Sequence, residues 1–271
     1  MSFGPLVDAG WLRDHLHDAD VRVIDFRWYL QGRNGRAEYL RGHIPGAVFV
    51  DLEDVTAEEG SGRHPLPTAE QFQRAMRRAG VGSRTRVIAY DDEGGAFAAR
   101  LWFLLGYFGH DRQAVLDGGL QAWGAPLETD VSPVDAGDFV AHAPDGSLVL
   151  DYVALRALRG VPVVDARAGA RYRGETEPVD PKAGHIPGAL SAPFVENLGP
   201  DGRFKPADEL RAQYERLGAA NGAVFYCGSG VNATHHLIGM QIAGLPNARL
   251  YAGSWSDWSR REAPVATGPE P

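Results

Sequence analysis

The chain has 271 residues and a net charge of −8, and its hydrophobic and charged fractions of 44% and 23% are typical of a globular protein. Lysine and arginine are scattered along the sequence, so no surface for nucleic acid is predicted. We see no leader-like start, no apolar run long enough to cross a membrane and only one cysteine, which predicts a cytoplasmic protein without an intramolecular disulfide.

The first half of the chain alternates short β-branched segments with helical ones. A helix is predicted over 68–80 with Thr68 as its N-cap. The stretch 124–146 is rich in Pro, Gly and Asp and predicts a connection, with a candidate edge strand at 138–143. The strand segments lack polar alternation, which is typical of parallel strands covered on both faces, and they are VRVID (21–25), RVIAY (86–90) and QAVL (113–116).

The second half repeats this order. Its predicted strands are VPVVD (161–165), AVFY (223–226) and ARLY (248–251), and its helix over 207–219 has Asp208 as the expected N-cap. Four matches recur in the same order: VRVIDFR (21–27) with VPVVDAR (161–167), GHIPGA at 42–47 and 184–189, RVIAYDDEGG (86–95) with AVFYCGSGVN (223–232), and VLDGGLQAW (115–123) with LYAGSWSDW (250–258).

Such a long period indicates a duplicated domain. Strands that alternate with helices form a parallel sheet. We therefore predict two α/β domains over 1–124 and 147–271, joined by a linker over 125–146. Each domain should be a doubly wound, mainly parallel sheet with helices on both faces.

The sole cysteine, Cys227, ends a predicted buried strand and is followed by a glycine-rich turn and a helix. Gly228 and Gly230 allow successive backbone N–H groups to turn toward one centre, and the helix adds the positive end of its dipole. Both features favour a thiolate, and the same amides would stabilise a persulfide anion. The expected active-site loop is Gly228, Ser229, Gly230, Val231 and Asn232.

Other roles for this cysteine fit less well. A buried packing role is disfavoured because the flanking glycines offer little to pack against. A cysteine phosphatase needs an arginine that closes its loop on the phosphate, but Ala233 takes that place. A helix would carry His235 and His236 away from the thiol, which disfavours a Cys–His protease, and these residues have no metal-ligand spacing, so no metal is expected.

Together, the duplicated VIDFR/VVDAR and GHIPGA segments, the loop CGSGVNA (227–233) and GSWSDW (253–258) resemble the rhodanese family of sulfurtransferases in its tandem two-domain form. The resemblance covers nearly the whole chain and implies two rhodanese-like domains. Asp91 stands where the second copy has Cys227, so the N-terminal domain should be catalytically silent. GHIPGA is interpreted as a turn shared by the fold.

The resemblance implies a two-step exchange without a cofactor. The Cys227 thiolate takes sulfur from a small anionic donor to form a persulfide, and cyanide or a thiol acceptor, such as a thioredoxin-like protein, removes it. The loop is similar to that of 3-mercaptopyruvate sulfurtransferases, and neutral Gly228 and Ser229 favour a keto-thiol with one carboxylate. Thiosulfate stays open as the donor. The competing hypothesis is a non-catalytic persulfide carrier or sensor that delivers sulfur to a protein partner.

Further site residues follow from the resemblance. Arg171 matches the family's anion-binding arginine, whereas the second arginine expected before GHIPGA has no clear match in EPVDPKAG (177–184). Ser229 matches a loop serine that handles protons together with a histidine of the first domain, and His43 is the matching histidine in this sequence. We expect Asp165, at the end of its strand, to support the loop backbone.

Overall fold

The structure is a computed structural model that describes residues 4–131 and 133–271. It divides into two compact units of the same architecture. Unit 1 contains Met1–Ala57, Pro67–Pro144 and Asp201–Arg203, and unit 2 contains Glu58–Leu66, Asp145–Pro200 and Phe204–Pro271. Each half of the chain therefore contributes one short loop to the unit that the other half builds.

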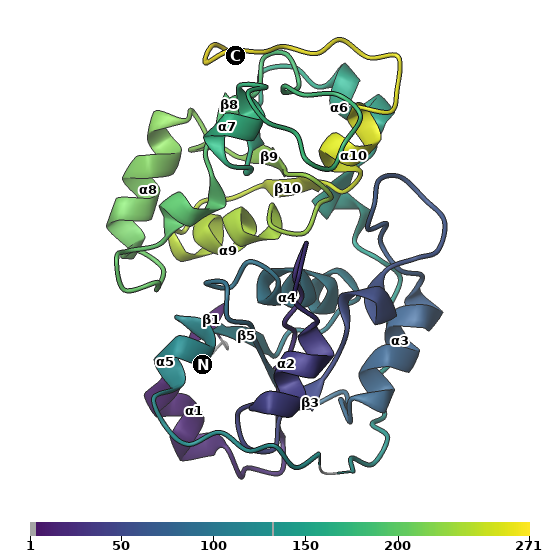
Figure 1. Cartoon of the computed structure of the whole chain (residues 1–271), viewed down its shortest axis with the longest axis vertical. Helices are drawn as coiled ribbons and strands as arrows, with labels where there is room; N and C mark the ends of the chain where they lie inside the picture. Colours follow the sequence, from purple (N-terminus) through teal and green to yellow (C-terminus); the bar gives the residue numbers. More distant parts are fainter. Residues whose placement is uncertain (1–3, 132) are drawn as a thin grey trace. The chain divides into compact units, whose positions relative to one another are not determined.

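Unit 1 is a five-stranded sheet in the order β1-β5-β4-β2-β3, and every pair of neighbouring strands is parallel. Figure 1 labels β1, β3 and β5 of this sheet and the helices of the unit. Its strands are β1 (Leu6–Val7), β2 (Val21–Asp25), β3 (Val48–Phe49), β4 (Arg86–Tyr90) and β5 (Gln113–Leu116). Its helices are α1 (Ala9–His15), α2 (Gly35–Arg41), α3 (Ala69–Arg78), α4 (Ala98–Tyr107) and α5 (Gly119–Trp123), with a 3₁₀ turn η1 (Leu52–Val55).

Unit 2 repeats this topology with the strand order β6-β10-β9-β7-β8, again with parallel neighbours. Its strands are β6 (Val149–Leu150), β7 (Val163–Asp165), β8 (Leu190–Ser191), β9 (Ala223–Tyr226) and β10 (Ala248–Tyr251). Its helices are α6 (Tyr152–Ala157), α7 (Gly169–Tyr172), α8 (Ala207–Arg216), α9 (Thr234–Ile242) and α10 (Ser254–Trp258), with 3₁₀ turns η2 (Gly146–Leu148) and η3 (Phe194–Asn197).

Both faces of each sheet are covered, as the uniformly apolar strands predict. In unit 2, Val224 and Tyr226 of β9 pack with Trp255 and Trp258 of α10 and with Leu155 of α6. Helix α9 contacts β9 and β10 and also packs on α8. The prediction of two doubly wound domains is therefore confirmed, and the carboxyl ends of the central strands are left to carry the site.

The GHIPGA segments have a structural role in both units. In unit 2, the Arg167 guanidinium donates to both carboxylate oxygens of Asp165 and to the Gly184 carbonyl at 2.7 Å. His185 Nδ1 bonds the Tyr172 carbonyl at 2.8 Å, and the two rings stack. Unit 1 forms the same contacts, which are made by Asp25, Arg27, Tyr39, Gly42 and His43.

Two expectations about single segments are wrong. No strand forms over 138–143, because Phe139 there is bonded to the end of α3 instead of a sheet edge: its carbonyl accepts from the Arg77 side chain and its N–H donates to Val81. Asp208 does not cap α8, because that helix already begins at Ala207 after Pro206, which places Asp208 in the first turn. Thr68 caps α3 as predicted, since its hydroxyl accepts from the N–H of Gln71.

A buried polar cluster in unit 2 joins η3, α8 and α9. His236 Nε2 lies 2.9 Å from the Ala192 carbonyl and must therefore carry the proton, so Nδ1 accepts from the Asn197 amide at 3.2 Å. The Asn197 carbonyl oxygen accepts from Gln213 and Tyr214. Burial lowers the pKa of His236 from 6.5 to about 4, so the cluster is built around a neutral imidazole.

This imidazole should make unit 2 acid-sensitive. Above pH 6.5 both the folded and the unfolded chain hold it neutral, but as the pH falls toward 4 only the unfolded chain takes up the proton. The free energy of unfolding should therefore fall by about 3 kcal/mol across this window. Urea denaturation of the wild type and His236→Gln at several pH values measures the effect. Parallel pH profiles for the two proteins would contradict it.

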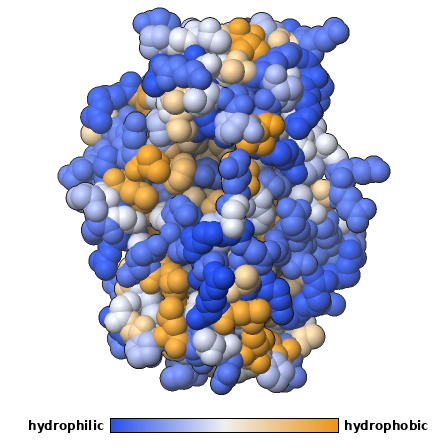
Figure 2. Space-filling view, viewed as in Figure 1, coloured by the Kyte–Doolittle hydropathy of each residue, from blue (hydrophilic) through white to orange (hydrophobic). Residues whose placement is uncertain are grey.

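Exposed large hydrophobic side chains are separated along the sequence. They are Leu30, Leu40, Leu127, Val131, Val140, Val153 and Val195. On the face in Figure 2, hydrophobic residues form small groups among hydrophilic ones. In the part of the chain that the structure describes, no helix combines the length and apolar character that crossing a membrane requires.

Candidate active site

Cys227 directly follows β9 and is held through its backbone. Its N–H donates to the Ser254 hydroxyl at 3.1 Å, and its carbonyl accepts from the Trp255 N–H at 3.0 Å. The residue is only 4% exposed and its thiol is free. The start of α10 thus fixes the cysteine at the carboxyl edge of the sheet, where ligands bind in folds of this class.

Ser254 adopts an unusual backbone conformation to form this contact. Its φ angle of 53° lies in the left-handed region, and the residue is fully buried. The first repeat has Gly119 at the matching position, with φ 57° and no strain. Holding a serine in this conformation costs roughly 1 kcal/mol or more of folding free energy. The hydroxyl of this serine accepts the hydrogen bond from the Cys227 N–H.

The loop after Cys227 requires glycine at position 230. Gly230 has φ 77°, and a β-carbon there would lie 2.4 Å from the Ala252 carbonyl oxygen. Val231 and Ala233 are buried and anchor the loop, and the carbonyl of Asn232 accepts the His235 N–H at the start of α9. The strand, glycine turn and helix expected from the sequence are therefore present.

The first repeat reveals what this loop shape binds. Asp91, at the position of Cys227, is fully buried, and its carboxylate accepts four backbone N–H bonds of 2.8–2.9 Å from Glu93, Gly95, Phe97 and Ala98. Burial raises the pKa of Asp91, while these four donors oppose the rise. The matching segment of unit 2 spans 228–234 and has one glycine with positive φ, Gly230, before helix α9.

The sequence interpretation missed a loop that completes the site. Glu58–Leu66 belongs to unit 2, where the Arg63 N–H donates to the Ser256 hydroxyl at 3.0 Å. His64 Nδ1 lies 2.8 Å from Ser229 Oγ, and both residues are buried. In the structure, therefore, His64 and not His43 is the histidine bonded to the loop serine. His43 forms its contacts inside unit 1, with Tyr39 and Glu128.

A repeated dipeptide was the signal that could have found this loop. Gly62–Arg63 and Gly202–Arg203 occupy matching places, each a few residues before a helix, and the structure assigns each to the unit built by the other half of the chain. Such a short match in irregular segments carries little weight by itself, because its role depends on contacts between distant parts of the sequence.

Arg171, near the end of α7, reaches the cysteine loop. A β-carbon at Gly228 would lie 3.3 Å from Arg171 Nη1 and 3.1 Å from Arg63 Nη2. Two guanidinium groups therefore converge beside the residue that follows Cys227. Guanidinium forks of this kind are suited to a carboxylate or sulfonate.

Buried carboxylates orient both arginines. Glu177 accepts from Arg171 Nη2 at 2.6 Å, and Asp180 accepts from Arg63 and, at 3.5 Å, from Arg171. Burial disfavours the charged form of Glu177, but hydrogen bonds from Arg171 and from two backbone amides hold its pKa below the ordinary value. Arg167 adds a further contact to Glu177 at 3.2 Å.

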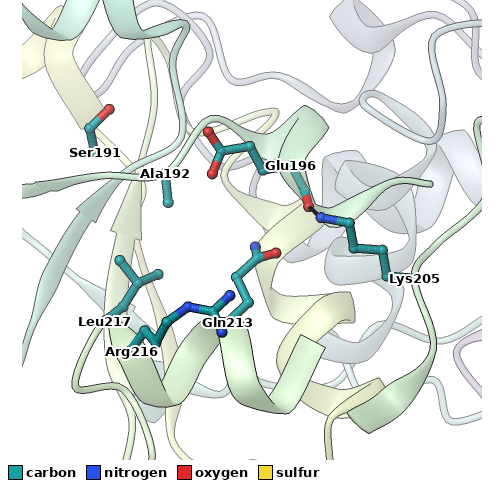
Figure 3. A pocket seen from close by; sticks show the side chains of 7 residues that line it. All are labelled: Ser191, Ala192, Glu196, Lys205, Gln213, Arg216 and Leu217. Atoms are coloured by element: carbon teal, nitrogen blue, oxygen red, sulfur yellow. Dashed lines mark hydrogen bonds between the residues drawn. The ribbon is translucent and has the colours of Figure 1, made fainter. Parts of the chain in front are cut away.

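A cavity of about 290 Å³ opens elsewhere in unit 2, between β8, η3 and α8 (Figure 3). At one side of it, Lys205 Nζ donates to the Glu196 carbonyl at 2.6 Å. Its lining consists of Ser191, Ala192, Glu196, Lys205, Gln213, Arg216 and Leu217, none of which is a predicted site residue. It is distinct from the cysteine loop.

Comparisons with known proteins match both halves of the chain to one family. The rhodanese-like domain model matches residues 8–126 and 151–261. A Pseudomonas aeruginosa protein named "Probable 3-mercaptopyruvate sulfurtransferase" is 45% identical over 99% of this chain and 100% of its own, and the Escherichia coli 3-mercaptopyruvate sulfurtransferase is 37% identical over 98% and 99%. The crystal structure of SseA from Escherichia coli matches with a TM-score of 0.83 at 34% identity, covering 93% of this chain and 99% of its own.

The duplicated fold and its single cysteine loop thus define a protein of two tandem rhodanese-like domains. The chain belongs to the rhodanese family. It is an enzyme of the sulfurtransferase class, which moves sulfur from a donor to an acceptor.

Proposed function

We propose that this enzyme transfers sulfur through a persulfide on Cys227, with 3-mercaptopyruvate as its preferred donor and thiosulfate as the alternative. The observation that carries the proposal is the convergence on one loop of the sole cysteine, the Arg171 guanidinium and the His64–Ser229 hydrogen bond. A nucleophile, an anion-binding group and a proton-handling pair are what a keto-thiol donor requires.

In the first step the Cys227 thiolate attacks the donor sulfur. For 3-mercaptopyruvate the C–S bond breaks, its electron pair passes to carbon as the enolate of pyruvate, and the thiol proton is transferred to that carbon. For thiosulfate the S–S bond breaks, sulfite leaves and no proton moves. Arg171 would hold the carboxylate or sulfonate, and the Ser229–His64 pair would relay the proton.

In the second step cyanide attacks the outer sulfur of the persulfide, releasing thiocyanate and restoring the thiolate. A thiol acceptor, such as a thioredoxin-like protein, would remove the sulfur by disulfide exchange instead. By analogy with the Glu93, Gly95 and Phe97 amides that bind the Asp91 carboxylate, the amides of 229, 231 and 233 would surround the persulfide anion. Because Asp91 fills the equivalent position in unit 1, we propose that the domain over 1–124 is catalytically silent and that the domain over 147–271 carries the chemistry.

Arg171→Ala should weaken donor binding more than the chemical step. Loss of a charged hydrogen bond to the donor anion should raise KM about 10- to 100-fold for both donors, with a smaller change in kcat. Steady-state kinetics with cyanide as acceptor measures both constants, and thermal unfolding checks that the fold survives. An unchanged KM for both donors would remove Arg171 from the binding site.

The direct test is to follow the sulfur. Incubation with 3-mercaptopyruvate should add the mass of one sulfur atom to the protein, and cyanide should remove it as thiocyanate, with kcat/KM measured for both donors side by side. Repeated turnover supports the enzyme. A single stoichiometric burst would favour the carrier or sensor hypothesis. The absence of any protein-bound sulfur would refute the persulfide.

A further inference from the structure

Three arginines surround one buried carboxylate beside the cysteine loop. The side chain of Asp180 is 0% exposed, and its Oδ1 accepts from Arg63 while its Oδ2 lies 3.5 Å from Arg171 Nη2. Arg260 Nη1 lies 3.6 Å from Oδ1, but its side chain is 51% exposed and therefore strongly screened. A carboxylate desolvated to this degree is stable only because the guanidinium groups neutralise it.

Arg63 and Arg171 are the two guanidinium groups that lie beside Gly228, next to Cys227. Asp180 contacts both of them, each with a different oxygen. It therefore sets the distance between the two cations and holds Arg63, which comes from a loop without regular secondary structure. Of these three residues, the sequence motifs indicated only Arg171.

The charges of this cluster nearly balance. Arg63 and Arg171 face two buried carboxylates, Asp180 and Glu177. Arg167, which also contacts Glu177, is matched by its own partner Asp165. A donor anion that the two guanidinium groups attract is therefore also repelled by two fixed negative charges, those of Asp180 and Glu177.

We propose that Asp180 is a specificity-determining residue: its carboxylate lowers the positive potential of the Arg63–Arg171 pair and so favours a donor with one negative charge over a donor with two. The inference deepens the proposed function and rests on it. 3-Mercaptopyruvate with its thiol protonated carries a single charge, whereas thiosulfate is a dianion. The repulsion from Asp180 scales with donor charge, so the dianion loses twice as much as the monoanion.

Asp180→Asn tests this at nearly constant shape, because an amide keeps one oxygen that can accept from an arginine. Relative to the wild type, the ratio of kcat/KM for thiosulfate to kcat/KM for 3-mercaptopyruvate should rise about 3- to 30-fold. The rise should shrink as salt is added, since ions screen the rim of the site. Asp180→Glu keeps the charge, and its donor ratio should stay within about twofold of the wild type.

Glu175→Gln is the matched control. Glu175 lies in the same segment and pairs with Arg173 at the surface, so its substitution removes one negative charge without touching Arg63 or Arg171. The donor ratio of this variant should not change. An unchanged ratio in Asp180→Asn, or an equal rise in Glu175→Gln, would overturn the proposal. If the wild type turns over neither donor, the proposed function itself fails, so the two failures are distinguishable.

Discussion

Replacing Cys227 with serine should abolish sulfur transfer to cyanide from both donors. The serine hydroxyl stays protonated near neutral pH and cannot form a persulfide, so the two-step route is closed. The loss in kcat should be at least about 10³-fold, because no second group in the loop can take over a covalent step. Thiocyanate formation, measured with 3-mercaptopyruvate and with thiosulfate, gives the result directly.

Two controls make this outcome specific. Cys227 is buried and its amide is bonded to Ser254, so the thermal unfolding of the serine variant must be compared with that of the wild type. Because the chain has one cysteine, alkylation of the wild-type thiol should abolish activity in parallel, with one modified group per chain. Turnover of Cys227→Ser at the wild-type rate would end the persulfide hypothesis.

The parts of the protein that the sequence predicted are those fixed by local pattern. Strands such as 223–226 and 86–90 are buried on both faces of the sheet. Consecutive residues in such strands are therefore apolar, and that pattern can be recognised in the sequence. Cys227 was identifiable for the same reason, since a strand, a glycine turn and a helix adjoin it in the sequence. Each signal occurs twice because the domain is duplicated, and this repetition is what predicted two domains of one architecture.

The parts that the sequence did not predict depend on long-range contacts. Arg63 and His64 lie in an irregular loop whose partners, Asp180 and Ser229, are more than a hundred residues away. His43 was the more conspicuous histidine because it stands in a repeated motif. The repeat has a different cause: His43 and His185 both bond a tyrosine carbonyl and stack on its ring, which is a requirement of the fold.

The contact between His64 and Ser229 predicts an asymmetric effect on the two donors. His64→Ala should lower kcat/KM for 3-mercaptopyruvate about 10²- to 10⁴-fold, the range that general acid–base catalysis contributes. Thiosulfate should be affected far less, because its sulfur leaves sulfite behind without any proton transfer. Steady-state kinetics with both donors and one acceptor, at a common pH, measures the split.

Three further variants serve as controls for the effect of His64→Ala. If Ser229 and His64 act as one relay, Ser229→Ala should reproduce the split, and the double variant should lose little more than either single one. His43→Asn is the matched control, because His43 contacts Tyr39 and Glu128 and not the loop serine. In this variant the ratio of kcat/KM for the two donors should equal that of the wild type, even if its stability falls. An equal loss for both donors in His64→Ala would mean that the 2.8 Å contact only supports the loop. In that case the proton of the keto-thiol must be carried by another group, and the preference for 3-mercaptopyruvate would have to come from charge alone.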